Sequence, residues 1–315
     1  MSKRSPRVTL AMPVYNGENY LAKAIVSILS QYYGDFELVI TDNASTDRTE
    51  EIARDFAARD RRIRYFRNAR NVGAAANYNR GFSLATGEYL KWCAHDDLIS
   101  ENFVSTCVGV LDEDETLSLV FARTVGIDDL GHTTQPVGHE TPALLDHDPT
   151  RRFMDAITLG GTCFPIFGLF RMSALRRSTL HRPYYGSDRG LIAEMALLGR
   201  FQRTPEATFF NREHLDRSIN IGDKLARSRW QTGASSRGAA AEHINLARHL
   251  FEIAGRHPDI ASPWKLRANL AGHTLKRRQL GRYCLELASI ISPSAGRWMR
   301  TAFSTRTTAS FDVSS

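Results

Sequence analysis

The sequence is poor in cysteine and has no long apolar run. Its 315 residues include only four cysteines, which are scattered and contain no C-x-x-C pair. This spacing does not suit a zinc knuckle or a disulfide framework, so we expect free, buried thiols. No apolar run is long enough to span a bilayer, and residues 1–7 lack the apolar core of a secretory signal. We therefore expect a cytoplasmic protein.

The remaining composition is that of an ordinary globular protein, with 42% hydrophobic and 24% charged residues. The length allows one large α/β domain with a smaller appendage, or two domains. The net charge of +7 is unevenly placed, because residues 216–315 hold 16 Lys and Arg against 7 Asp and Glu, and residues 1–215 hold 25 against 27. The positive charge of the last third indicates a local binding face.

Strand and helix patterns alternate over the first 125 residues, which predicts a mostly parallel sheet flanked by helices. Apolar runs predict strands over residues 7–13, 36–42, 63–68, 87–94 and 117–124. Helical spacing predicts helices over residues 19–31, 47–60, 73–86 and 100–114, the last opening on Ser100.

The later residues follow a less regular pattern. We expect a long surface loop over 126–150, a strand and helix over 168–177, a helix over 187–201 with Ser187 as its N-cap, and a last strand over 207–213. From 230 to 300 the pattern is helical, with breaks at Pro258 and Pro263. The expected parts are an α/β domain over 1–215, a basic helical region over 216–303 and a disordered tail over 304–315.

Polar residues follow each of the first four predicted strands. In an open parallel sheet, ligands bind beyond the carboxyl ends of the strands. The residues in question are Pro13, Tyr15 and Asn16 after the first strand, Asp42 and Asn43 after the second, Asn71 and Gly73 after the third, and Asp96 and Asp97 after the fourth. Tyr15 could instead pack on the rim of the sheet, and Asp42 and Asn43 could be turn residues. Together, however, they supply what a nucleotide diphosphate needs.

The adjacent acids Asp96 and Asp97 follow the buried-looking stretch Tyr89 to Ala94. Two like charges at the end of a buried strand repel each other and lose hydration, and a divalent cation relieves both effects. Mg²⁺ or Mn²⁺ could also neutralise charge on a departing diphosphate. The alternative is that one of the acids caps the following helix.

Several of these motifs occur in a familiar order. The pattern "PVYNGENYLAKAIVSILSQ…FELVITDNASTDRT…NVGAAANYNRG…GEYLKWCAHDD" resembles the family 2 glycosyltransferases, which have the GT-A-type fold, over roughly residues 7–215. The resemblance implies a metal-dependent enzyme that moves a sugar from a nucleotide-diphospho-sugar donor to an acceptor hydroxyl, usually with inversion. It also implies a glycan or lipid-linked acceptor in cell-surface polysaccharide or glycolipid synthesis.

The resemblance gives roles to individual residues. By motif position, Tyr15 stacks on the base, Asp42 and Asn43 read the base and ribose, and Asp96 and Asp97 hold the metal and the diphosphate, with Asp97 the more direct ligand. Many family members have two acids where this chain has Asp42 and Asn43, which leaves the base open. His214 could reach the metal as histidines do in some GT-A enzymes.

The family also places a catalytic base at the start of a later helix, and Asp188 fits that position. A helix N-terminus keeps such a carboxylate ionised, so that it can take the proton of the acceptor hydroxyl. The alternative is that Asp188 only stabilises its helix, with Glu194 as a second candidate for the base.

Two further regions have softer signals. In "NVGAAANYNRG", Asn71, Gly73 and Asn77 are expected to shape the site, although the alanines fit simple helix-on-sheet packing equally well. The basic helical region could contact the inner face of an anionic membrane or an acidic glycan, or it could be a solvated bundle packed on the core.

Competing functions fit less well. A sugar nucleotidyltransferase usually has a Gly-rich, basic signature after its first strand, which "PVYNGENY" lacks. No nucleic acid is expected as a partner, because the basic last third contains no helix-turn-helix, zinc or RNP-like motif. A non-catalytic relative that only binds nucleotide sugar stays open.

Overall fold

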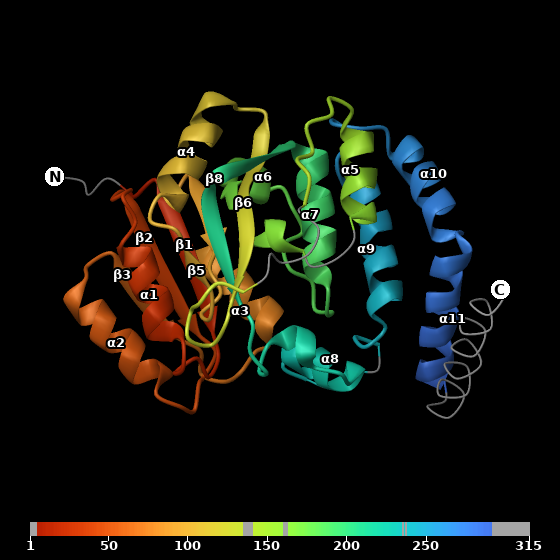
Figure 1. Cartoon of the computed structure of the whole chain (residues 1–315). Helices are drawn as coiled ribbons and strands as arrows, with labels where there is room; N and C mark the ends of the chain where they lie inside the picture. Colours follow the sequence, from red (N-terminus) through yellow and green to blue (C-terminus); the bar gives the residue numbers. More distant parts are fainter. Residues whose placement is uncertain (1–4, 135–140, 160–162, 235, 237, 292–315) are drawn as a thin grey trace, which may run out of the picture.

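The first half of the sheet consists of four parallel strands, shown in red to orange in Figure 1. The structure is a computed structural model, and it describes residues 5–134, 141–159, 163–234, 236 and 238–291. The four strands are β1 (Val8–Val14), β2 (Phe36–Asp42), β3 (Ile63–Arg67) and β4 (Tyr89–Trp92). Every residue of β1, β2 and β4 is buried, because helices cover both faces of the sheet. The connecting helices are α1 (Leu21–Leu29), α2 (Thr49–Arg59) and α3 (Ala74–Leu84).

The second half of the sheet is mixed. It contains β5 (Leu98–Ile99), β6 (Leu117–Ile127), β7 (Leu169–Arg171) and β8 (Arg200–Arg212), with α4 (Phe103–Glu113) and α6 (Met172–Leu175) between them. The strand order is β3-β2-β1-β4-β7-β6-β8-β5. β7 runs antiparallel to β4 and β6, and β5 runs antiparallel to β8. The predicted mostly parallel sheet with flanking helices is therefore confirmed.

Most of the remaining helices lie beside the sheet, and α8 lies below them in the view of Figure 1. They are α5 (Pro149–Thr158), α7 (Ser187–Leu198), α8 (Lys224–Thr232), α9 (Glu242–Arg256), α10 (Pro263–Thr274) and α11 (Arg277–Ile291), with short 3₁₀ turns η1 (Phe164–Phe167) and η2 (Ser218–Asn220). Helix α9 packs on α7, α10 and α11. The helical character predicted for the last third is confirmed up to Ile291, with α9 ending before Pro258 and α10 beginning at Pro263.

Two apolar clusters form the core, one on each side of the sheet. The first joins the sheet to α1 and α4, and the second joins the opposite face to α7, α9 and α10. Leu191 of α7 and Leu250, Ile253 and Leu270 of the helical region belong to this second cluster. The basic helical region therefore shares a core with the α/β part. The boundary at residue 215 stays a prediction, and the tail at 304–315 lies outside the described residues.

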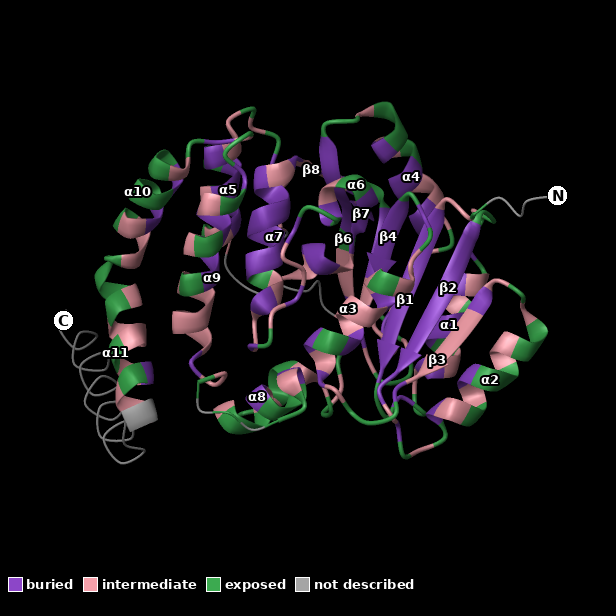
Figure 2. Cartoon of the chain, turned by 180° about the vertical axis from the view of Figure 1, so that it is seen from behind, coloured by how far each residue is buried: buried purple, intermediate pink, exposed green. Residues whose placement is uncertain are grey.

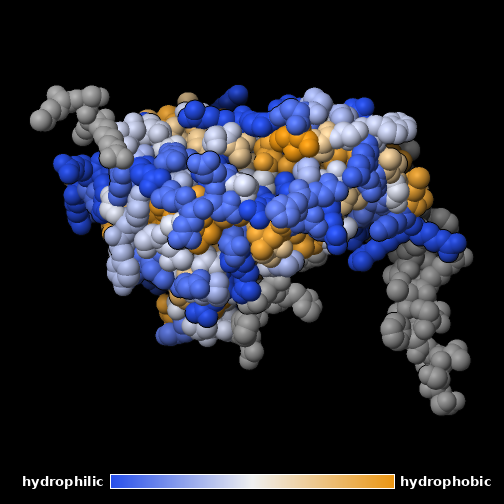
Figure 3. Space-filling view, turned by 90° about the horizontal axis from the view of Figure 1, so that it is seen from above, coloured by the Kyte–Doolittle hydropathy of each residue, from blue (hydrophilic) through white to orange (hydrophobic). Residues whose placement is uncertain are grey.

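The molecular surface is mainly polar on the face seen from above, where apolar patches are small and separate (Figure 3). Figure 2 shows the strands and α7 largely buried, whereas α2 and α8 expose more of their residues. Among the residues that the structure describes, no helix is both long and apolar enough to cross a membrane. All four cysteines are free as expected, but only Cys93 and Cys107 are fully buried.

The structure corrects the predicted loop over 126–150. Strand β6 continues to Ile127, Leu144 bridges to Phe201, and α5 begins at Pro149. Asp148 caps α5 by accepting a hydrogen bond from the Thr150 N–H, and proline suits the first helical position. Asp148 and Pro149 are the local signals for the start of this helix, but the polar residues around them favoured the prediction of a loop.

Other boundaries also differ from the prediction. Strand β8 begins at Arg200, seven positions before the predicted 207, because its first half pairs with β6. Ser100 does not open a helix, since it pairs with Thr208 at the sheet edge and α4 starts at Phe103. The N-cap of α7 is Gly186, in the left-handed conformation with φ 85°, and Ser187 is the first helical residue.

Candidate active site at the carboxyl ends of the strands

The loop after β1 is tied to the loop after β2. Pro13 is buried in β1, whereas Tyr15 directly after the strand exposes 42% of its surface. Asn16 has a positive φ of 51°, its N–H donates to Ser45 Oγ, and its Oδ1 accepts from the Thr46 N–H. Asn16 thereby fixes the two loops to each other and leaves the Tyr15 ring free to present a face at the edge of the sheet.

Asp42 ends β2 and is fully buried. Its Oδ1 accepts from the Ser45 N–H at 2.8 Å, and its Oδ2 accepts from Tyr65 OH at 2.7 Å and from Arg67 at 2.5 Å. Both carboxylate oxygens are thus engaged by the protein. This arrangement compensates the buried charge and organises the loop below it.

Asn43 belongs to a buried cluster of asparagines that joins β2 to α3. Its Nδ2 donates to Asn71 Oδ1, and its Oδ1 accepts from Asn68 Nδ2 and from the Val72 N–H. Asn77 donates to the Thr41 carbonyl and accepts from Asn68. The polar atoms of Asn43 and Asn77 are therefore occupied, and a donor contact for either residue stays a prediction.

Gly73 is the N-cap of α3 and has φ 85°, a conformation that favours glycine. A Cβ placed on Gly73 would lie 2.4 Å from the backbone of Thr232 and Gly233 at the end of α8. The start of α3 therefore touches the helical region directly, and the glycine serves backbone packing at this point.

Asp96 is paired with His214, which follows the end of β8. Its Oδ2 lies 2.9 Å from His214 Nε2, although the two residues are 118 positions apart. Burial opposes ionisation of Asp96, but the nearby His95 and the hydrogen-bonded His214 outweigh it and lower its pKa to about 2. His214 is itself buried, and its Nδ1 has no hydrogen-bond partner in the described structure.

Asp97 is more deeply buried and is held by β8. Its Oδ1 accepts from the Arg212 N–H at 2.8 Å and from Asn211 Nδ2 at 3.2 Å. Burial raises the pKa of Asp97 well above its usual range, and the adjacent charge of Asp96 adds to the effect. The pKa values of the two neighbouring acids are thus shifted in opposite directions. This is expected for carboxyl groups that share a site with too little positive charge to neutralise both.

Asp188 lies in the first turn of α7, beside η1. The thiol of Cys163 donates a hydrogen bond to the Asp188 carboxyl, which also accepts from backbone N–H groups at the start of the helix. Burial raises the pKa of Asp188, although Arg189 and these N–H groups limit the rise. A carboxylate in this state is more basic than one exposed to water, which suits a proton acceptor.

Glu194 lies two turns further along α7 and is unsuited to that role. It is fully buried, and its carboxylate accepts from Thr179 and His257 and forms an ion pair with Arg256. These contacts link α7 to the loop after α6 and to α9. Glu194 therefore holds the helix that carries Asp188.

Tyr78 of α3 lies within the electrostatic influence of both the metal motif and the candidate base. Burial raises the pKa of its phenol, and the next causes are the charges of Asp96, Asp97 and Asp188. All three carboxylates are therefore close enough to act on one side chain. Its ring also packs against His181 and Trp92, with centroids 4.9 and 6.3 Å away.

Three of these neighbours have no recognisable signal in the sequence. Tyr78 stands in the highlighted stretch after β3, but a tyrosine inside a helix reads as packing. Arg212 donates to the Asp96 carbonyl from beneath the site, and Arg217 donates to Asn211 and acts on the charge of Asp97. Arg212 is the last residue of β8 and Arg217 follows that strand. Both are distant from the acids in sequence, and only the fold brings them close.

Another acidic cluster has metal-like spacing but a structural role. Within the described part of the chain, Glu242, His243 and Glu286 are the group whose ligand atoms lie within 4.8 Å of one another. Arg227 binds Glu242, and Lys224 binds Glu286, which also accepts from the N–H groups of His243 and Ile244 at the start of α9. The acids are already neutralised by cations and serve to join α8, α9 and α11.

The comparison with known sequences identifies the family. A sequence model described as "Glycosyl transferase family 2" matches residues 9–177, more than half of the chain. The chain belongs to glycosyl transferase family 2. The predicted resemblance is confirmed, and the match contains β1 to β7 with the loops that follow the first four strands.

Curated relatives agree with this family over their shared part. An uncharacterized glycosyltransferase of Rickettsia typhi is 34% identical over 130 residues, which are 41% of this chain and 40% of the relative. Glycosyltransferase GlyG of Streptococcus pneumoniae is 35% identical over 102 residues, 32% of this chain and 34% of the relative. The chain thus spans less than half the length of these two relatives.

Solved structures show the same fold at low identity. S. aureus TarS 1-349 in complex with UDP-GlcNAc has a TM-score of 0.57 at 17% identity, over 90% of this chain and 80% of that one. The mannosyltransferase PcManGT from Pyrobaculum calidifontis, in complex with GDP-Man and Mn²⁺, has a TM-score of 0.50 at 18% identity, over 94% of this chain and 87% of that one. At this identity the likeness supports the GT-A-type fold alone.

Proposed function

We propose that this chain transfers a sugar from a nucleotide-diphospho-sugar to an acceptor hydroxyl. The observation that carries the proposal is that Asp96 and Asp97 of the loop after β4 and Asp188 of α7 all act electrostatically on the same side chain, Tyr78 of α3. Acids for a diphosphate-bound cation and a carboxyl group of raised pKa are the two functions that such a transfer needs side by side. The family membership supports the same reaction class.

The donor is proposed to lie across the carboxyl ends of β1 to β4. The half-exposed ring of Tyr15 offers a stacking face for the base, and the loops that Asn16, Asp42, Asn43 and Asn71 hold in place form the floor below it. Fold relatives bound UDP-GlcNAc in one case and GDP-Man in another, so the fold accommodates both bases. The base and the sugar used by this chain are left to experiment.

The side chains around Asp96 fit a divalent cation. Asp96 and His214 offer an oxygen and a nitrogen 2.9 Å apart, and His214 has an orphaned buried ring nitrogen. A carboxylate oxygen with one imidazole nitrogen suits Mn²⁺ or Mg²⁺. When bound, such a cation would neutralise charge on the diphosphate. One fold relative was solved with Mn²⁺, which supports the cation without fixing its identity.

The proposed reaction is a single displacement with inversion. Asp188 takes the proton from the acceptor hydroxyl while the hydroxyl oxygen forms a bond to the anomeric carbon. The bond from that carbon to the diphosphate oxygen breaks, and the leaving nucleoside diphosphate keeps the electron pair. The acceptor must approach from the face opposite the diphosphate, which places Asp188 and the acids after β4 on opposite sides of the sugar.

A thermal-shift screen tests this proposal. The chain is heated with UDP-, GDP-, dTDP- and CMP-sugars, each with and without Mn²⁺, and one diphosphate sugar is expected to stabilise it in a metal-dependent manner. Asp96→Asn and Asp97→Asn should weaken that stabilisation, because they remove charge from the cation site. Asp188→Asn should keep it and lower turnover by about 10²- to 10⁴-fold, because only the proton acceptor is lost.

The control is Asp55→Asn, which changes an exposed acid of α2 and should leave binding and turnover unchanged. The proposal would be wrong if no nucleotide-diphospho-sugar stabilised the chain. If a nucleotide sugar bound but was not turned over with any of a range of acceptors, the result would instead favour a non-catalytic relative that only binds nucleotide sugar. A role in cell-surface polysaccharide or glycolipid synthesis is part of the proposal and depends on the acceptor.

A further inference from the structure

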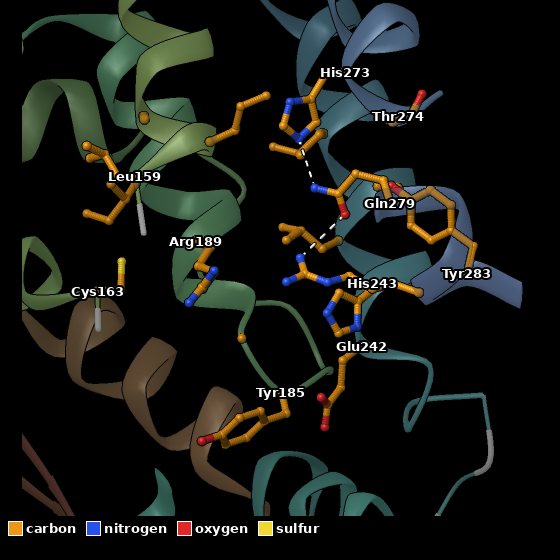
Figure 4. A pocket seen from close by; sticks show the side chains of 18 of the residues that line it. Leu159, Cys163, Tyr185, Arg189, Glu242, His243, His273, Thr274, Gln279 and Tyr283 are labelled. Carbon is orange, nitrogen blue, oxygen red and sulfur yellow. Dashed lines mark hydrogen bonds between the residues drawn. The ribbon is translucent and has the colours of Figure 1, made fainter. Parts of the chain in front are cut away.

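Helices α10 and α11 form an outer edge of the molecule, at the end opposite to α2 and β3 (Figures 1 and 2). Their inner sides border a cavity of about 320 Å³, which α5, α7 and α9 also line. In Figure 4, His273 of α10 and Gln279 of α11 point into this cavity and are hydrogen-bonded to each other. Leu266 and Leu270 are buried on the same side of α10, as their helical spacing from His273 requires. The opposite side of α10 therefore faces away from the core.

Two large apolar side chains lie on that outward side. Trp264 exposes 81% of its surface and Leu275, directly after the last residue of α10, exposes 66%. Their spacing is close to three full helical turns, which places them on one face about 16 Å apart along the axis. Ala268 and Gly272, which lie between them on this face, are exposed and small. These four residues, the outer face of α10, form an apolar stripe that no described segment covers.

The charge around the outer face of α10 is of one sign. Residues 263–285 contain six Lys and Arg and no Asp or Glu. Lys276, Arg277 and Arg278 follow Leu275 directly and are exposed, and within the described part of the chain they form no ion pair. A positive cluster therefore adjoins the apolar stripe.

The acids on and around the two helices are already neutralised. Four ion pairs account for them: Asp148 with Lys265, Glu286 with Lys224, Glu252 with Arg182 and Asp259 with Arg177. The groove between α9, α10 and α11, where Glu252 stands, also contains Arg248 and Arg267. These acids therefore do not offset the charge of Lys276, Arg277 and Arg278.

An exposed tryptophan and leucine on one helix face, beside unpaired cations, are typical of a helix that lies on a membrane. The indole ring and the leucine side chain gain by entering the interfacial layer, and lysine and arginine are attracted to anionic headgroups. An acidic glycan or a nucleic acid would use the same cations, but neither offers an apolar layer for Leu275. No described helix can cross a bilayer, so the contact would be with its surface.

We propose that the outer face of α10, together with Lys276, Arg277 and Arg278, binds the surface of an anionic lipid bilayer. Trp264 and Leu275 enter the interfacial layer, and the three cations lie at the level of the headgroups. Helix α10 then lies flat on the membrane, because its apolar stripe runs along the whole helix. This contact does not depend on the proposed sugar transfer.

Co-sedimentation of the full chain with lipid vesicles tests the proposal. The vesicles consist of phosphatidylcholine alone or of phosphatidylcholine mixed with phosphatidylglycerol, at low ionic strength. The chain is expected to bind the anionic vesicles at least about tenfold more tightly than the neutral ones. Added salt should weaken this binding, because it screens the attraction between the cations and the headgroups.

Two sets of substitutions separate the apolar from the charged contribution. Trp264→Ser combined with Leu275→Ser should lower binding to anionic vesicles by about tenfold or more and leave its salt dependence in place. Replacing Lys276, Arg277 and Arg278 by Gln should lower the binding by a similar factor and remove most of the salt dependence.

Matched controls lie on helices at the other end of the molecule. Val26→Ser changes a residue of α1 that exposes 52% of its surface. A triple replacement by Gln in and just after α2 removes the same net charge from exposed positions: Arg54, Arg59 and Arg61. Both controls should bind vesicles like the unmodified chain, and circular dichroism shows whether each variant folds.

Three results would overturn the membrane contact. They are equal binding to neutral and anionic vesicles, binding that the change of Trp264 and Leu275 leaves intact, and binding to a single-stranded oligonucleotide or an acidic polysaccharide without binding to vesicles. Failure of the transferase proposal is distinguishable from all three, because a chain that bound vesicles but no nucleotide sugar would keep this contact and lose only sugar transfer.

Discussion

Four carboxyl groups of the candidate site are held in four different ways. Arg67 and Tyr65 neutralise Asp42, His214 pairs with Asp96, backbone and amide N–H groups hold Asp97, and the first turn of α7 holds Asp188. Because the environment sets the chemistry of each acid, residues of the same type serve different purposes here. Asp42 supports the fold, the pair after β4 suits a cation, and Asp188 suits proton transfer.

The raised pKa of Asp188 gives a prediction for the pH dependence of catalysis. The base acts only when it is deprotonated, so kcat/KM should fall as the pH drops through the pKa of Asp188, which burial places above the usual value of 3.8. Cys163→Ala removes a hydrogen bond that favours the carboxylate and should move the acidic limb of the profile to higher pH. An acidic limb that is the same in both proteins would contradict this role of Cys163.

At the scale of helices and strands, the sequence predicts an element when the residues of that element form a recognisable pattern by themselves. It does not predict an element that forms only because it pairs with a distant segment. The buried strands β1, β2 and β4 can be recognised as apolar runs, because each of their residues faces a covered side of the sheet. Strand β5 has only Leu98 and Ile99 and exists because Phe209 and Phe210 pair with it. No local pattern identifies a strand of that kind.

The same distinction applies to the candidate site. Tyr15, Asp96 and Asp97 were found because each directly follows a recognisable strand. The partners of the two acids are Arg212 at the end of β8 and His214 just after it, and both lie more than a hundred positions away. Sequence spacing gives no measure of such an approach, which is set by the antiparallel pairing of β5 with β8, where Leu98 lies opposite Phe210.

Helix α7, which carries Asp188, depends on a close contact with α9. A Cβ on Gly190 would lie 2.5 Å from His249 Nδ1 and 3.1 Å from Tyr184 OH, so the two helices meet where one of them has no side chain. His249 uses that position to hydrogen-bond Tyr184 OH at 2.9 Å and Thr179 Oγ1 at 2.7 Å. The glycine therefore permits a buried polar contact that fixes the start of α7.

Gly190→Ala should lower the free energy of unfolding by roughly 1–3 kcal/mol, because the new methyl group displaces His249. Gly109→Ala is the matched control, since Gly109 lies inside α4 with nothing within 4 Å of its added Cβ. That change should stabilise the protein by about 0.5–1 kcal/mol through helix propensity. Urea unfolding measures both values, and equal effects of the two substitutions would count against the close contact.

At the scale of the whole molecule, the helical region and the α/β part are joined by buried polar groups as well as by a common apolar core. Glu194 of α7 receives hydrogen bonds from Thr179 and from His257 after α9, and His249 of α9 contacts Thr179 and Tyr184. Such groups are costly to bury unless every partner is in place. We therefore infer that the helical region and the sheet unfold together.

This buried network should make the stability of the whole chain depend on pH. Burial lowers the pKa of His249 from 6.5 to about 4, and the charges of Arg182 and Arg256 act in the same direction against those of Glu194 and Glu252. Between these two values the unfolded chain binds a proton that the folded chain does not bind, so the free energy of unfolding rises with pH in this window. The contribution of His249 is complete above about pH 6.5 and is lost as the pH falls toward 4, and it amounts to roughly 3 kcal/mol.

Urea unfolding at about pH 7.5 and about pH 5 should therefore show a loss of stability that is smaller in His249→Gln than in the unmodified chain. His132→Gln changes an exposed histidine of the loop after β6 and should keep the full loss. If His249→Gln lost as much stability between the two pH values as the unmodified chain, then His249 would not be the group that links acidity to the joining of the two parts.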